Sequence, residues 1–78
     1  NDKFRPTFIP GFIPSDYSFV IFDRWGNQLF ETDDIYSSWN AYYKGDIVKS
    51  ETYVWQISFL EKETDIRHLA MGHVSVLR

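Results

Sequence analysis

The segment IFDRWGNQLFET, residues 21–32, decides the predicted fold. It joins the end of one apolar stretch, 17–23, to a second stretch, 28–32, through a short turn that contains Gly26. Both stretches are rich in the aromatic and β-branched residues that favour strands, and glycine can adopt a positive φ without steric cost. The pattern predicts an antiparallel hairpin closed by a type I turn with a glycine bulge.

The first stretch of this hairpin is apolar on both of its faces. Side chains alternate between the two faces of a strand, which places Tyr17, Phe19 and Ile21 together on one face. Val20 and Phe22 fall on the opposite face and are also apolar. Because apolar residues on both faces are typical of a strand inside a sheet, we expect this one to be central.

Alternation returns later in the chain, over residues 52–60. Tyr53 and Trp55 fall on one face of this stretch, and Gln56 and Ser58 fall on the other. We therefore expect both aromatic residues to lie in the core.

The chain ends in two further apolar stretches, residues 66–71 and 73–77. They are interpreted as separate strands, with Gly72 between them as a bend or a bulge. The charged segment 61–65 is interpreted as the connection that leads into the first of them.

Two connecting segments accompany the predicted strands. Residues 33–49 are mostly polar and are interrupted by Asp, Ser, Asn and Gly, which indicates a connection from which Trp39 enters the core. Near the start, Pro6, Pro10 and Pro14 recur at every fourth position. Their spacing forbids a helix there and allows extended backbone.

The fold predicted from these stretches is all-β. No segment has the i, i+3, i+4, i+7 spacing of apolar residues that a helix requires over a useful length. Six or seven short strands at intervals of about 8–12 residues favour a small immunoglobulin-like antiparallel β-sandwich. A chain of 78 residues is long enough for one core, so we expect a single domain, 1–78.

Composition excludes several classes of function. The net charge is −3 and the basic residues form no stripe, which argues against a nucleic-acid partner. The absence of Cys excludes disulfides and thiolate metal sites. No apolar run approaches the roughly 20 residues that cross a bilayer as a helix, so direct membrane insertion is not expected.

Catalytic and metal sites find little support in the sequence. His68 and His73 have no obvious third ligand, and the cluster of Glu31, Asp33 and Asp34 matches no calcium loop, so solvated surface positions are favoured for all five. There is no Gly-x-Ser-x-Gly elbow, no Cys nucleophile and no glycine-rich phosphate loop. We therefore expect a protein that is not an enzyme and needs no cofactor.

The predicted turn contains residues that a plain hairpin does not need. Arg24 and Trp25 stand side by side before Gly26 and Asn27, and a guanidinium beside an indole can form a rigid recognition knob at the tip. The alternative is that Trp25 folds back onto the core and Arg24 covers its ring. The sequence leaves both interpretations open.

Several short motifs follow one another in the order of a known family. Besides residues 21–32, these motifs are Asn1-Asp2-Lys3-Phe4, Trp39-Asn40, Tyr43-Lys44-Gly45, Glu51-Thr52-Tyr53-Val54-Trp55 and Gly72-His73-Val74-Ser75-Val76-Leu77-Arg78. Together they resemble the gliding-motility-associated C-terminal domain, the type B sorting domain of the type IX secretion system. Ala41 and Glu51 stand where this family usually has glycine.

The resemblance implies a folded, non-catalytic tag that directs an upstream cargo protein to the type IX translocon. It implies a porin-like outer-membrane partner and a cargo that passes through the periplasm to the cell surface or the medium, often as an adhesin. The residues expected to contact the partner are Arg24, Trp25, Gly26, Asn27, Val76, Leu77 and Arg78. Those expected to serve the fold are Trp39, Tyr53, Trp55 and Gly72.

A second hypothesis comes from the aromatic residues of the polar connection. A surface adhesion or glycan-binding module would present a row of exposed rings, since aromatic platforms stack on sugars. The candidates for that row are Tyr36, Trp39, Tyr42 and Tyr43.

Overall fold

The computed structural model describes residues 4–8 and 12–77, and in these residues the protein is all-β without a helix. No segment of this described part could therefore cross a membrane as a long apolar helix. The strands are β1 (Ser15–Phe22), β2 (Gln28–Thr32), β3 (Tyr42–Tyr43), β4 (Asp46–Ile47), β5 (Glu51–Glu61) and β6 (Ile66–Val76).

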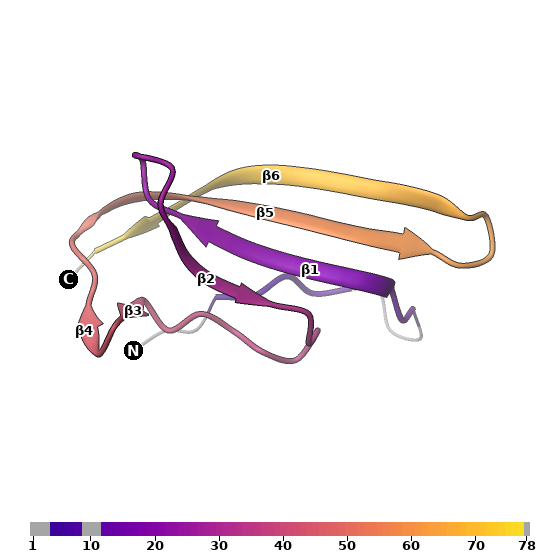
Figure 1. Ribbon diagram of the computed structural model, residues 1–78, viewed down its shortest axis with the longest axis horizontal. Coiled ribbons are helices and arrows are strands. Elements are labelled where there is room, and N and C mark those ends of the chain that lie inside the picture. The colour runs from indigo at the N-terminus through magenta and orange to yellow at the C-terminus, as the bar shows by residue number, and fades with distance from the viewer. Residues whose placement is uncertain (1–3, 9–11, 78) are drawn as a thin grey trace.

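Four of the strands form one antiparallel sheet in the order β2-β1-β5-β6, and β3 and β4 form a separate small hairpin (Figure 1). The all-β prediction is confirmed, and β1 is a central strand, as its two apolar faces predicted. The strands are less uniform than expected, because β5 and β6 each have eleven residues. The immunoglobulin-like sandwich is not shown by this arrangement and stays a prediction.

The core lies on one face of the four-stranded sheet. Tyr17, Phe19 and Ile21 of β1 point into it, and β5 contributes Tyr53 from the same face. Burying an aliphatic or aromatic side chain of this kind stabilises the fold by about 1.5–3 kcal/mol. The remaining buried members of the core are Trp39 and Val48, both from the connection between β2 and β5.

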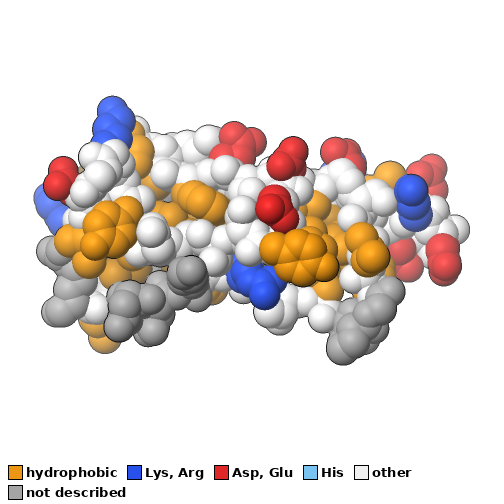
Figure 2. All heavy atoms as spheres, turned by 90° about the horizontal axis from the view of Figure 1, so that it is seen from below, with side chains coloured by type: hydrophobic (Ala, Val, Ile, Leu, Met, Phe, Trp, Pro, Cys, Tyr) orange, Lys and Arg blue, Asp and Glu red, His pale blue; other side chains and the backbone are white. Residues whose placement is uncertain are grey.

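Two segments without long strands cover this core. The backbone N–H of Phe4 donates to the carbonyl of Trp39, and the N–H of Trp39 donates to the carbonyl of Phe4, both at 2.8 Å. This pair ties the proline-containing start of the chain to the 33–49 connection, and Phe8 packs on the core from the same start. Trp39 is only 2% exposed, which confirms that it enters the core. Figure 2 shows hydrophobic side chains that reach the surface in separate patches on one face of the molecule.

The end of the chain differs from its prediction. Residues 66–71 and 73–77 do not form two strands, because β6 runs without interruption from Ile66 to Val76 and pairs with β5 in a continuous register. Gly72 is therefore neither a bend nor a bulge but lies within the ladder opposite Trp55. Its role follows from packing, since the Trp55 indole occupies the space where a Cβ would stand.

The opposite face of the sheet is more open. Val20 on β1 lies in register with Gln56 on β5, which lies in register with Met71 on β6, so these side chains share the face away from the core. Leu69 and Met71 are 68% and 66% exposed there. β6 is also a long edge strand of the sheet, a position that can accept a further strand from another chain.

Candidate recognition surface

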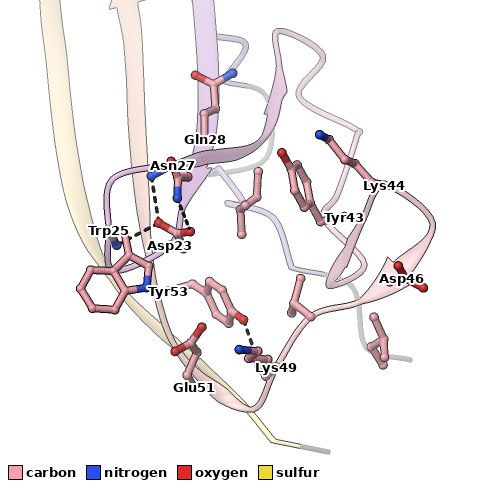
Figure 3. A pocket seen from close by; sticks show the side chains of 13 residues that line it. Asp23, Trp25, Asn27, Gln28, Tyr43, Lys44, Asp46, Lys49, Glu51 and Tyr53 are labelled. Carbon is pink, nitrogen blue, oxygen red and sulfur yellow. Dashed lines mark hydrogen bonds between the residues drawn. The ribbon is translucent and has the colours of Figure 1, made fainter.

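The turn between β1 and β2 is organised by Asp23. Its Oδ1 accepts hydrogen bonds from the backbone N–H groups of Trp25 at 2.9 Å and Asn27 at 2.8 Å, and its Oδ2 accepts one from Asn27 Nδ2 at 3.0 Å (Figure 3). The N–H of Gly26 donates to the Asp23 carbonyl at 3.1 Å, and Gly26 has φ of +88°. The i to i+3 bond and the positive φ agree with the predicted turn, and the ladder shifts register between Ile21 and Phe22.

The charge of Asp23 supports the same turn. Loss of contact with water raises the pKa of the Asp23 carboxyl, but hydrogen bonds from Asn27, Trp25 and Gly26 outweigh this effect and hold the pKa below its usual value. The ionised carboxylate is thus the form that the turn prefers. This role of Asp23 was not predicted from the sequence, although an Asp before a glycine turn is a known signal for a side-chain cap.

Trp25 points away from the core, so the interpretation in which it folds back onto the core is wrong, and its part in recognition stays a prediction. Its side chain is 74% exposed, and the Arg24 guanidinium carbon lies 4.9 Å from the centre of its ring. Arg24 Nε also lies 3.6 Å from Glu51 Oε1, so the arginine bridges the turn to the start of β5. The turn therefore presents an exposed indole: Asp23 holds the backbone of Trp25, and Arg24 lies over the ring.

The other predicted contact segment lies at the same end of the molecule. Val76, the last residue of β6, pairs with Glu51, the residue that Arg24 contacts. Leu77 follows it and is largely exposed, while Arg78 lies outside the described residues. Figure 1 shows the β1–β2 turn, the β3–β4 hairpin and the end of β6 gathered at one end of the sheet.

A groove of about 600 Å³ opens between the turn and the β3–β4 hairpin (Figure 3). Asp23, Trp25 and Asn27 line it from the turn, and Tyr43 and Lys44 line it from the hairpin. We name this feature the turn–hairpin groove. Tyr43 and Lys44 belong to one of the family motifs in the sequence, but their position on the same surface as Trp25 was not predicted.

The residues predicted to serve the fold lie under or beside this surface. Tyr53 is 2% exposed, and its hydroxyl donates to the Lys49 carbonyl at 2.8 Å. Its ring meets Trp39 edge to face at 5.4 Å between centroids. Trp55 is half-buried on the core side of β5, against Gly72. These contacts fix the start of β5, which contributes Tyr53 to the floor of the groove.

No group of three potential metal ligands occurs among the described residues. His68 contacts Glu61 Oε1 through Nε2 at 2.9 Å and stacks on Phe59. His73 pairs with Val54, on the face opposite to His68, so the two histidines do not share a site.

The aromatic row of the second hypothesis is incomplete. Trp39 is in the core rather than on the surface, and its indole N–H donates to the Tyr42 carbonyl at 3.3 Å. Tyr36, Tyr42 and Tyr43 are exposed. The row therefore lacks one of the four rings that this hypothesis placed on the surface.

Comparison with known proteins identifies the family. The family model described as CHU_C Type IX secretion signal domain matches residues 1–76. No curated protein and no solved structure matches the chain. The chain thus belongs to the type IX secretion signal domains: it is a non-catalytic sorting signal for cargo of that system, which exports proteins across the outer membrane.

Proposed function

We propose that the export machinery recognises this domain in its folded form, through the Arg24–Asn27 turn and the end of β6, Val76 to Arg78. The observation that carries this proposal is the outward position of Trp25 on a turn capped by Asp23. An exposed indole next to an arginine is a combination that interfaces use as an energetic anchor. Its fixed geometry reduces the entropy lost when a partner binds.

The partner that we propose is a porin-like protein of the outer membrane acting with the translocon, as the resemblance implies. Residues 1–78 would act as one domain, with the immunoglobulin-like layout that this resemblance also implies. Its cargo would remain on the cell surface, for example as an adhesin, or be released into the medium. The family match supports export across the outer membrane and leaves these finer steps to experiment.

The test is export of a fluorescent protein that is sent to the periplasm and carries residues 1–78 at its carboxyl end. It is made in a cell with the type IX system and the matching outer-membrane partner. Trp25→Ser is the variant, and Tyr36→Ser is its matched control. Trp25 and Tyr36 are 74% and 75% exposed, and each has an arginine over its ring.

The proposal predicts that the wild-type and Tyr36→Ser fusions reach the outside of the cell, while Trp25→Ser stays in the periplasm in folded form. A second fusion that lacks residues 74–78 should also be retained. Export of Trp25→Ser at the wild-type level would remove the turn from the recognition surface. Retention of a folded wild-type fusion, with the partner present, would refute recognition by this domain.

A further inference from the structure

The turn–hairpin groove has an exposed aromatic ring on each of its two sides. Trp25 stands on the turn with Arg24 over its ring, and Tyr43 stands on the hairpin with Lys44 Nζ 5.3 Å from its ring centre. Figure 3 shows the two rings on opposite sides of the opening. One pair of ring and cation therefore stands on the turn side of the groove, and a second pair stands on the hairpin side.

Both sides of the groove are built on fixed backbone. The turn is held by the hydrogen bonds of Asp23. The hairpin closes through Lys44 and Gly45, whose φ angles are +53° and +86°, while Tyr43 pairs with Asp46. Positive φ at both central residues is the requirement of the tight two-residue hairpin turn that matches strand twist. A partner would therefore meet two rings that are already in place, which favours binding.

The floor between the rings is apolar. Val48 and Tyr53 are buried at its base, and Leu29 lines it from β2. Ile47 lies on the hairpin side and is partly exposed. The exposed apolar surface of the groove belongs to Trp25, Tyr43 and Ile47, which are 74%, 39% and 42% exposed. An apolar side chain of a partner placed between them would remove this surface from water.

The charges of the groove differ between its two sides. On the turn side, Asp23 is engaged by its hydrogen bonds and Glu51 lies against Arg24. On the hairpin side, the lining contains Lys44 and Asp46, while Lys49 lies next to Tyr53 near the start of β5 (Figure 3). Because Asp23 and Glu51 already have partners, an acidic group of the export partner would be attracted toward the lysines that border the groove.

We infer that the turn–hairpin groove receives an extended segment of the export partner, whose apolar side chain lies between Trp25 and Tyr43 and whose carboxylate faces Lys44. This inference rests on the proposed function and extends the recognition surface from the turn to the hairpin. A protein segment suits the groove better than a sugar, since each ring already has a cation on one face. Trp, Tyr and Arg at one site are also the residues that dominate protein interfaces.

The test uses the same fluorescent fusion with two pairs of variants. Tyr43→Ser is compared with Tyr42→Ser, its neighbour on β3, which does not line the groove although its ring is 48% exposed against 39% for Tyr43. Lys44→Glu is compared with Lys62→Glu, which reverses a charge in the loop at the far end of the sheet. Thermal unfolding of each purified domain shows whether the variant is folded.

Tyr43→Ser and Lys44→Glu are expected to lower the exported fraction by about tenfold, while both controls stay within about twofold of the wild type. If both groove variants are exported at the wild-type level while Trp25→Ser is retained, the inference about the groove is refuted. The proposed function would still hold in that case. If Trp25→Ser is also exported at the wild-type level, both the inference about the groove and the proposed function are refuted. Retention of a folded wild-type fusion refutes the proposed function itself.

A photoreactive phenylalanine analogue at position 43 identifies the occupant. In the exporting cell, the expected product is an adduct with one segment of the outer-membrane partner that contains an apolar residue next to Asp or Glu. An adduct with a polysaccharide or lipid, or with a partner segment that lacks carboxylates, would overturn the inference.

Discussion

Gly72 on β6 lies directly beneath the indole of Trp55 on β5, so closely that a Cβ on the glycine would stand 2.5 Å from Trp55 Cζ2. The two residues face each other across the ladder, and the ring fills the space that another side chain would take. A glycine is therefore required at this position for packing rather than for a special backbone angle.

Gly72→Ala should accordingly destabilise the domain by about 1–3 kcal/mol, because the indole must move to admit the methyl group. Denaturant unfolding of the purified domain measures this change. The same substitution in a Trp55→Leu background should have a much smaller effect, since the smaller side chain leaves room. An equal penalty in both backgrounds would show that the indole is not the cause.

Ala41 has φ of +66°, in the left-handed region that favours glycine, and its carbonyl accepts a hydrogen bond from Val48 at 2.8 Å. The strain of a left-handed alanine is about 1–2 kcal/mol, and the added freedom of glycine in the unfolded chain offsets about 0.4–1 kcal/mol of it. Ala41→Gly should thus stabilise the domain by about 0.5 kcal/mol. Ala70→Gly, in the regular part of β6, is the control and should destabilise it. A loss of stability in Ala41→Gly would contradict this reading.

Tyr17 has a buried hydroxyl with no hydrogen-bond partner in the described part of the chain. Tyr17→Phe removes this group and should stabilise the domain by about 1 kcal/mol, measured by denaturant unfolding. Tyr53→Phe makes the same chemical change but loses the bond to the Lys49 carbonyl, so it should destabilise the domain. A loss of stability in Tyr17→Phe would show that the hydroxyl has a partner.

Tyr17 also makes the stability of the domain depend on pH in the alkaline range. Burial raises the pKa of Tyr17 to about 12, with a smaller lowering by Arg5 and a smaller raising by Asp34. The Tyr17 hydroxyl holds its proton more tightly in the folded state than in the unfolded state. The contribution of the neutral hydroxyl to stability is therefore fully present below the ordinary pKa of 10.0, and it is lost as pH rises toward about 12. Tyr17→Phe should therefore lose less stability than the wild type over this range. Equal losses would indicate that other groups dominate.

Asp23 makes the stability of the domain depend on pH in the acid range, and here stability is lost as the pH falls. Its pKa is held below the usual value in the folded state, so the stabilising contribution is present above pH 3.8 and is lost as pH falls through the lower folded pKa. Wild-type stability should fall more steeply than that of Asp23→Asn below about pH 4. Unfolding followed by tryptophan fluorescence measures the difference. Asp46→Asn is the control, and a wild-type curve that matches Asp23→Asn would refute the role of the carboxylate.

The local parts of the fold were predictable from the sequence. Alternation placed Tyr17, Phe19 and Ile21 on one face of β1, and Gly26 marked the turn, because both signals depend on neighbouring residues only. Trp39 was expected in the core because a large aromatic in a polar segment gains most from burial.

The features that the sequence did not reveal depend on contacts between distant residues. Gly72 suggested a break in the strand because its partner Trp55 is known only once the register of β5 and β6 is fixed. The groove was missed for the same reason, since Trp25 and Tyr43 belong to different hairpins. Their approach depends on how the connection folds over the sheet.

The loop between β5 and β6 is a suitable site for a label that follows export. Residues 62–65 are exposed and lie at the end of the sheet opposite the turn–hairpin groove, in a molecule 40 Å long (Figure 1). A dye or short epitope attached there would stand clear of the segments expected to contact the translocon. Because the two strands that flank the loop are paired along their full length, such a label would report the position of a folded signal during its passage out of the cell.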